Sequence, residues 1–181
     1  MESNIKVKQI IAFTDGSSYN DTKNKMRHGG IGVYFPDYKN LNISRTIKVS
    51  NPTNQKTELL GCIYAVKKIK KILKEHDYKF TVKIYTDSKY VHDAMNSWCS
   101  KWEKNNWQRK KGKQNKSVSN LEYMKKLFRY KNKYNIEFEH VRAHKKEPEK
   151  TSKEWYYWNG NDQADQLAKN GMLKSKNKFR Y

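Results

Sequence analysis

The sequence is poor in acidic residues and in cysteine. Asp and Glu number 18 against 39 Lys and Arg, which gives a net charge of +21 over 181 residues. This excess of positive charge favours a polyanionic partner. The two cysteines, Cys62 and Cys99, are too few for a disulfide framework or a cysteine-ligated zinc site, and they suit a reducing compartment.

Long apolar runs are also missing. No stretch approaches the roughly 18 apolar residues of a membrane span, and the first residues lack the apolar segment of a secretion signal. We therefore expect a soluble, intracellular protein with no membrane partner. Only 35% of the residues are hydrophobic, but 5 Trp, 13 Tyr and 6 Phe indicate a folded chain, and its length fits one domain.

Hydrophobic periodicity predicts an α/β fold. Apolar or alternating segments predict three sequential strands at 7–14, 29–35 and 43–50, and two more at 80–86 and 135–141. The first strand is expected to end at a turn formed by Asp15 and Gly16. Three- and four-residue spacing predicts helices at 57–73, 88–104, 119–130 and 161–173. The order predicts a mixed five-stranded sheet, with three antiparallel strands and then two parallel ones. We expect a long loop at 145–157 and a basic, frayed tail at 174–181.

Four acidic residues stand where a strand ends or on the inward side of a helix. Asp15 and Asp87 directly follow two predicted strands, and if these are adjacent and parallel, both carboxylates lie at one edge of the sheet. Glu58 shares a helical stripe with apolar residues, which directs it towards the sheet. Asp165 borders an apolar stripe of the last helix. Ordinary alternatives exist: a turn for Asp15, a helix start for Glu58 and Asp87, and a solvated surface for Asp165.

A single shared site explains the positions of these four acidic residues better than four unrelated structural roles do. Converging carboxylates without thiols are typical of a site for a hard cation, and Mg²⁺ is its natural occupant. Two such ions about 4 Å apart can activate a water and stabilise the leaving oxygen of a phosphodiester. The basic charge and these acids together predict a nuclease or a related phosphoryl-transfer enzyme.

Five motifs in order resemble ribonuclease H of the type-one form over nearly the whole chain: FTDGS (13–17), TNQKTEL (53–59), YTDSKYV (85–91), HVRAH (140–144) and GNDQADQLA (160–168). The resemblance implies a ribonuclease H-like catalytic domain over 1–173, with a basic handle at about 97–118. It implies hydrolysis of the RNA strand of an RNA:DNA hybrid by two Mg²⁺ ions, or Mn²⁺, leaving 5′-phosphate and 3′-hydroxyl ends. It makes Asp15, Glu58, Asp87 and Asp165 the metal ligands.

The resemblance also assigns roles outside the carboxylates. His144 matches a mobile histidine that assists proton transfer or product release, although Ala143 replaces the usual glycine before it, and the segment from there to Asp165 is long. Asn51 stands where arginine is common, in a pocket for a phosphate of the DNA strand. The implied substrate contacts are Gly16, Ser17, Thr53, Asn54, Gln55, Trp98, Trp102, Lys110 and Asn120. We expect a monomer that cuts with little regard to base sequence, because contacts to sugar and phosphate carry no base information.

Two other functions compete with this one. A catalytically silent protein that binds hybrid or double-stranded RNA would be expected to have lost a site acid, and none is lost. An integrase-like enzyme of DNA strand transfer would share the fold, but the handle and the residues placed near the 2′-hydroxyls count against it.

Overall fold

The computed structural model describes residues 7–75, 79–111, 114–142 and 146–178. Its five-stranded sheet has the order β3-β2-β1-β4-β7. β1 (Val7–Asp21), β2 (Met26–Tyr34) and β3 (Ile43–Thr46) are antiparallel neighbours, and β4 (Lys79–Thr86) and β7 (Ile136–His140) run parallel to β1. The predicted mixed sheet is therefore confirmed.

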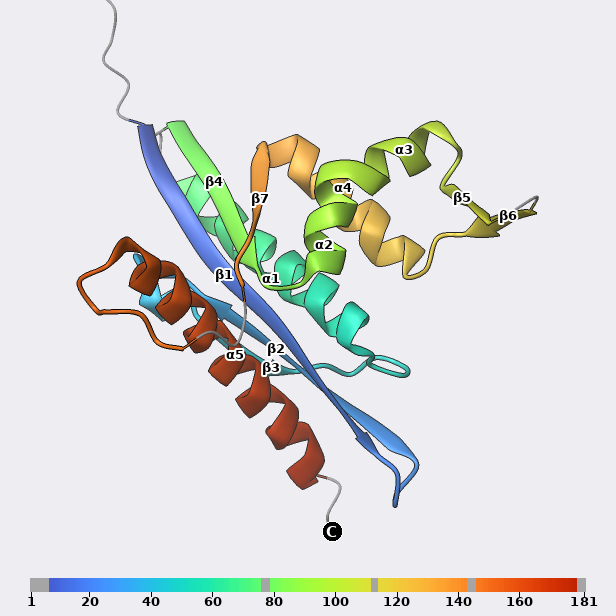
Figure 1. Ribbon diagram of the computed structural model, residues 1–181, viewed down its shortest axis with the longest axis horizontal. Coiled ribbons are helices and arrows are strands. Elements are labelled where there is room, and N and C mark those ends of the chain that lie inside the picture. The colour runs from blue at the N-terminus through green and yellow to red at the C-terminus, as the bar shows by residue number, and fades with distance from the viewer. Residues whose placement is uncertain (1–6, 76–78, 112–113, 143–145, 179–181) are drawn as a thin grey trace, which may run out of the picture.

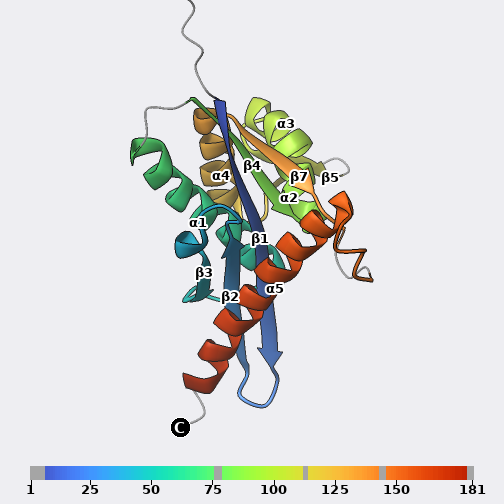
Figure 2. The same cartoon turned by 90° about the vertical axis from the view of Figure 1, so that its left-hand side faces the viewer.

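Helices cover both faces of the sheet (Figures 1 and 2). α1 (Asn54–Glu75) and α4 (Leu121–Tyr134) lie on one face, over a core that includes Ile10, Ala12 and Val33. α5 (Lys153–Lys178) crosses the other face, where Phe13 and Ala164 form a smaller cluster. Alternate residues of β1 thus supply the two cores, as the pleat of a strand requires.

The handle region follows β4. α2 (Lys89–Asp93), a π-helical turn (Ala94–Trp98) and α3 (Cys99–Lys104) form one continuous helical segment, in agreement with the helix predicted at 88–104. A two-stranded hairpin, β5 (Gln108–Lys111) and β6 (Gln114–Ser117), then projects from the body of the molecule (Figure 1). A short 3-10 turn (Lys39–Leu41) precedes β3.

The predicted end of the first strand is wrong. Asp15 and Gly16 do not form a turn, because β1 continues to Asp21 and pairs with β2 as far as the Asp21–Met26 pair. The polar residues 17–21 show no apolar alternation, so their sequence did not indicate a strand. Asp15 consequently lies in the middle of β1.

The predicted bounds of the last helix are also wrong. α5 begins at Lys153, within the stretch expected to be a loop, because the Ser152 hydroxyl caps it by accepting a hydrogen bond from the Trp155 amide at 3.2 Å. Tyr156 packs edge-on against Phe13, with ring centroids 5.8 Å apart. At the other end, the expected frayed tail is helical as far as Lys178. No described helix is long and apolar enough to cross a lipid bilayer.

Candidate active site

The candidate site forms where β4 leaves β1. These strands pair up to Thr14 and Thr86, and the next residue of each chain segment is an aspartate. From Asp15 onwards β1 still pairs with β2 but no longer with β4, so among the described strands this edge of the sheet is open. Asp15 and Asp87 meet there, as the sequence predicted for parallel neighbours.

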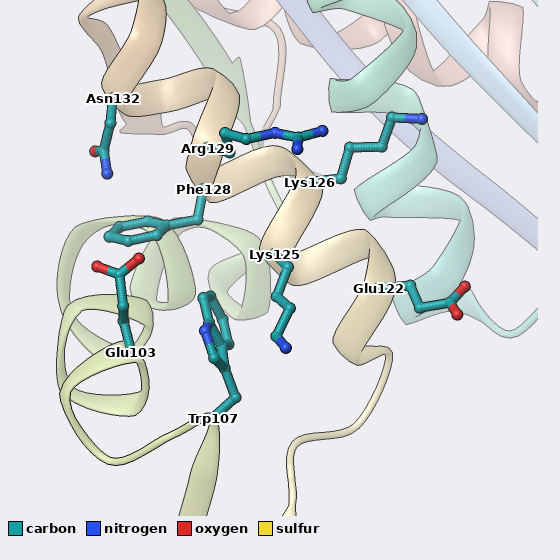
Figure 3. Close-up of a pocket in the computed structure, with 8 residues that line it drawn as sticks. All are labelled: Glu103, Trp107, Glu122, Lys125, Lys126, Phe128, Arg129 and Asn132. Atoms are coloured by element: carbon teal, nitrogen blue, oxygen red, sulfur yellow. The ribbon is translucent and has the colours of Figure 1, made fainter.

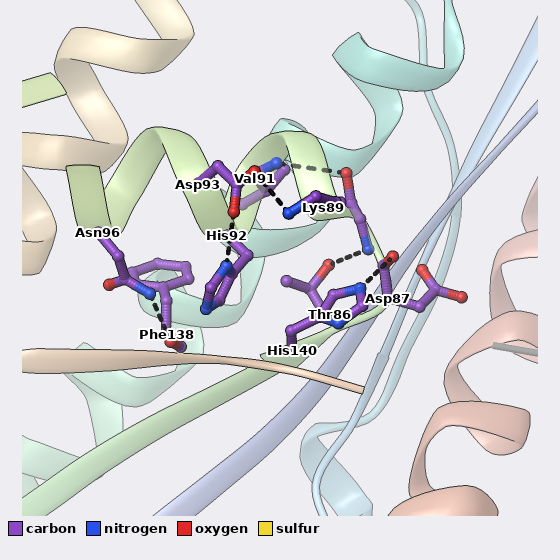
Figure 4. Close-up of polar contacts among 10 residues, drawn as sticks. Thr86, Asp87, Lys89, Val91, His92, Asp93, Asn96, Phe138 and His140 are labelled. Carbon is purple, nitrogen blue, oxygen red and sulfur yellow. Dashed lines mark hydrogen bonds and ion pairs between the residues drawn. The ribbon is translucent and has the colours of Figure 1, made fainter. Parts of the chain in front are cut away.

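Asp87 precedes α2 but does not cap it. Ser88 is the N-cap, and its hydroxyl accepts from the Val91 amide at 3.4 Å. The Nε2 atom of His140 lies 3.2 Å from the main-chain oxygen of Asp87, which accepts a hydrogen bond from it. Figure 4 shows these contacts and the carboxylate of Asp87 directed away from α2. The helix-start explanation for Asp87 therefore does not hold.

Glu58 reaches the same place because α1 lies directly against β1. A Cβ atom on Gly16 would lie 2.7 Å from the Thr57 hydroxyl and would collide with the backbone of Thr57 and Glu58. A Cβ atom on Gly61 would lie 3.0 Å from the main-chain oxygen of Asp15. Only glycine permits this approach, which brings the first turn of α1 to the open edge of the sheet.

Three carboxylates meet in this space. Oxygen atoms of Asp15, Glu58 and Asp87 all lie within 4.8 Å of one another. Asp15 is only 7% exposed, and the Oε2 atom of Glu58 is buried without a hydrogen-bond partner among the described residues. A buried carboxylate oxygen without a donor is costly, so this cluster is poorly satisfied by the protein's own groups.

The electrostatics reflect that cost. Burial, and then the nearby charges of Asp87 and Asp165, raise the pKa of Asp15 to about 7. Burial, followed by the charge of Asp15, raises the pKa of Glu58 well above its usual value. Without a cation, the pocket holds protons instead.

Asp165 lies beside this cluster rather than within it. It lines a cavity of about 390 Å³ with Asp87, Arg142 and Trp158, and its charge contributes to the raised pKa of Asp15. Its carboxylate accepts a hydrogen bond from the Lys169 ammonium at 2.6 Å.

Two further residues of α5 contact the carboxylates. The amide of Asn161, itself buried, donates to Oδ2 of Asp87 at 3.3 Å. Lys169 forms the ion pair with Asp165. Sequence reasoning missed both, although Asn161 stands inside the GNDQADQLA motif and Lys169 lies four residues after Asp165, the spacing of an ion pair on a helix.

The donor set suits a hard divalent cation. All the converging atoms are carboxylate oxygens, the ligands that Mg²⁺ and Mn²⁺ prefer, and a cation would satisfy the orphaned oxygen of Glu58 and relieve the repulsion. Asp15, Glu58 and Asp87 would hold it, with Asp165 alongside.

Comparison with known proteins identifies the family. The family model for RNase H matches residues 7–173. The chain belongs to the ribonuclease H family. It is 34% identical to the ribonuclease H of Orientia tsutsugamushi over 96% of this chain and 86% of that protein. It is 31% identical to a probable ribonuclease H of Acanthamoeba polyphaga mimivirus over 77% of this chain, a match that spans 56% of the viral protein's length.

Solved structures agree with the family. The solution structure of the PFV RNase H domain superposes with a TM-score of 0.66 at 25% identity, covering 91% of this chain and 94% of that domain. The ribonuclease H-like fold expected from the motifs is thereby confirmed, and the chain is a ribonuclease H enzyme.

The structure brings together two segments that the ribonuclease H resemblance assigns to substrate. The Ser18 hydroxyl donates to Oδ1 of Asn54 at 2.6 Å, so residues 16–18 of β1 adjoin the start of α1. Thr53 precedes α1, and its hydroxyl accepts from the Lys56 amide at 3.3 Å. Asn54 and Gln55 are exposed next to the carboxylates. This polar rim is open to a ligand.

The remaining substrate candidates lie around the handle. Trp98 and Trp102 pack against each other, with ring centroids 5.7 Å apart, and both are partly buried against the core. The Asn120 amide donates to the Tyr90 hydroxyl at 3.3 Å at the start of α4. Lys110 lies in β5, but its side chain is outside the described part of the structure, as is the whole of His144.

A cleft beside the handle joins aromatic and basic side chains. Trp107 and Lys125 face each other across it, with the ammonium 5.5 Å from the ring centroid, and Phe128 meets the indole edge-on (Figure 3). Its volume is about 590 Å³. Trp107 has a positive φ of 59°, which is unusual for a bulky residue and is held by a hydrogen bond from its amide to the Trp102 carbonyl.

Proposed function

We propose that this enzyme hydrolyses the RNA strand of RNA:DNA hybrids by a two-metal-ion mechanism, with Mg²⁺ as the cation and Mn²⁺ as a substitute, leaving 5′-phosphate and 3′-hydroxyl ends. Membership of the ribonuclease H family supports the substrate and the reaction class. The buried cluster of Asp15, Glu58 and Asp87, with the unpartnered oxygen of Glu58, is the observation that carries the proposal.

The carboxylates divide into two groups by their surroundings. Burial raises the pKa values of both Asp15 and Glu58, so binding of a cation displaces a proton from them. Asp87 is oriented by Asn161 at its carboxylate and by His140 at its backbone. When bound, divalent cations supply an activated water and stabilise the leaving oxygen of the phosphodiester.

Substrate recognition follows from the polar rim and the handle. Asn54 and Gln55 are proposed to contact the 2′-hydroxyls that distinguish RNA from DNA, together with the backbone of Gly16 and Ser17, and the hydrogen bond from Ser18 to Asn54 supports this grouping. The proposed contacts to the DNA strand are Thr53, Asn120, Trp98, Trp102 and Lys110. Such contacts to sugar and phosphate position the duplex without reading bases, so cleavage is largely independent of sequence.

The remaining roles rest on the family motifs. His144 is proposed to assist proton transfer or product release, since an imidazole titrates near neutral pH. The protein is proposed to act as a monomer of the type-one form.

A substrate comparison tests the proposal. The protein is incubated in Mg²⁺ with an end-labelled RNA:DNA hybrid, double-stranded DNA or double-stranded RNA of one sequence, and the products are mapped on a gel. Cleavage of only the RNA in the hybrid, with 5′-phosphate ends, is expected. Asp87→Asn should abolish cleavage while hybrid binding survives, because one ligand charge is lost from an otherwise intact surface. Full activity of Asp87→Asn would refute the metal assignment, and cleavage of double-stranded RNA alone would refute the substrate.

A further inference from the structure

The hairpin between β1 and β2 extends far past the carboxylates. β1 continues for six residues from Asp15 to Asp21 before the chain turns back into β2 at Met26. At about 3.3 Å per residue, this extension spans about 20 Å. Figures 1 and 2 both show the hairpin projecting beyond the other strands, on a different side of the end of β4 from the β5–β6 hairpin. We call residues 19–28 the β1–β2 arm.

The tip of the arm is basic. Lys23, Lys25 and Arg27 are exposed, and none of them forms an ion pair with any residue in the described part of the chain. Asp21 is the one acid of the arm, and it accepts hydrogen bonds from the Lys23 amide and from the backbone and side chain of Asn24. The acid therefore closes the turn, while the three cations face solvent.

The end of α5 supports the arm from behind. The Nδ1 atom of His28 and the hydroxyl of Ser175 are joined by a hydrogen bond of 3.1 Å, and the two residues are only 2% and 6% exposed. The Lys176 ammonium lies 4.2 Å from the centroid of the Tyr19 ring. A two-stranded ribbon alone is marginally stable in water, so this buried contact gives the arm a fixed position. It also brings the last turns of α5, which carry Lys174 and Lys176, against the base of the arm.

We propose that the β1–β2 arm, with Lys174 and Lys176, is a second nucleic-acid contact that binds phosphates of the substrate duplex on the side of the carboxylates away from the handle. The partner is a polyanion because the surface carries five cations, four of them exposed and Lys176 packed on the Tyr19 ring, while its acid is used within the turn. This inference rests on the proposed function, which supplies the duplex. A reach of about 20 Å corresponds to about six base pairs at 3.4 Å each.

A charge-removal experiment tests this proposal. Binding of 8- and 20-base-pair hybrids is measured by fluorescence anisotropy in EDTA at several salt concentrations, so that no cleavage occurs. The arm variant is Lys23→Ala/Lys25→Ala. The control is Lys71→Ala/Lys74→Ala, which removes the same charge from exposed positions at the far end of α1. Lys23, Lys25 and Lys74 are exposed and form no ion pair with any described residue, and Lys71 forms only a 3.8 Å surface ion pair with Glu75. Both variants should therefore fold.

The expected effect follows from counterion release. Each phosphate contact contributes about 0.9 to the slope of log K against log salt, so at 0.1 M salt the dissociation constant of the 20-base-pair hybrid should rise about 8-fold if one lysine contacts a phosphate and about 60-fold if both do. The slope should fall by about 1 to 2. An 8-base-pair hybrid centred on the carboxylates extends about four base pairs, or about 14 Å, to each side, which is short of the tip of the arm about 20 Å away. Its dissociation constant should therefore change by less than about 2-fold, as should that of the control with either duplex.

Two results would contradict the proposal that the β1–β2 arm binds the duplex. One is an equal loss of affinity in the arm variant and the control, which would mean a general charge effect. The other is an unchanged dissociation constant and salt slope for the 20-base-pair hybrid. Both outcomes are read from binding alone. If the wild type binds hybrid and fails to cleave it in Mg²⁺, the proposed function fails while the arm remains testable.

Discussion

Replacing Asp15 by Asn should stabilise the cation-free protein. Asp15 is buried, and its pKa rises from 3.8 in the unfolded chain to about 7 in the folded one. An acid with a raised folded pKa binds its proton more tightly in the native state, so its contribution to the free energy of unfolding is greatest at low pH. That contribution is lost as the pH rises from about 4 to about 7. At about 1.4 kcal/mol for each pH unit, the loss is about 4 kcal/mol.

Asparagine keeps the shape of the side chain but carries no charge at any of these pH values. In EDTA, Asp15→Asn should therefore match the wild type near pH 4 and exceed its free energy of unfolding by about 4 kcal/mol at pH 8. Urea denaturation followed by circular dichroism at several pH values measures this difference. Mg²⁺ should then stabilise the wild type but not the variant, because a ligand that binds only the native state adds to its stability.

The exposed Asp37 provides the matched control, since Asp37→Asn makes the same chemical change outside the pocket. Its free energy of unfolding should differ from that of the wild type by less than about 0.5 kcal/mol at every pH. A difference between Asp15→Asn and the wild type that does not vary with pH would refute the view that Asp15 is held in a crowded, poorly solvated carboxylate cluster.

Two other substitutions test how the site is held together. Gly16→Ala should lower the free energy of unfolding by about 2 to 3 kcal/mol in urea denaturation, because its Cβ would collide with the first turn of α1; unchanged stability would show that α1 can move away. Asn161→Ala should lower kcat for hybrid cleavage about 10-fold with little change in KM, because it removes an amide that orients Asp87. A normal kcat would mean that this amide has no positioning role.

Local periodicity was sufficient for most of the fold. Apolar alternation and helical spacing predicted five strands in the right order and the helices between them, since these signals arise from one buried face at a time. The end of β1 was not predictable in this way. Residues 17–21 are polar, and their strand is held by pairing with β2 and by the end of α5, which are distant in sequence.

The start of α5 shows the same limit. The polar stretch before it predicted a loop, but Ser152 caps the helix and Tyr156 and Tyr157 pack against Phe13 and Tyr85. Those rings belong to two strands far away in the chain.

The carboxylates of the candidate site could be predicted from the sequence, but the residues that contact them could not. Asp87 follows the end of β4, Asp15 follows the last residue of β1 that pairs with β4, and Glu58 lies on an inward helical stripe, so apolar periodicity marks all three positions. Asn161 and Lys169 depend on where α5 crosses the sheet, and that crossing is set by contacts such as Gly32, where any side chain would collide with Ala164.

Calorimetric titration with Mg²⁺ at pH 7 tests the carboxylate pocket most directly. The wild type should bind Mg²⁺ with release of protons, since Asp15 is partly protonated at this pH, and the released protons are measured by repeating the titration in buffers of different ionisation enthalpy. Glu58→Gln should bind Mg²⁺ much more weakly. Equal binding by Glu58→Gln and the wild type, with no proton release from either, would contradict a cation site built from these side chains.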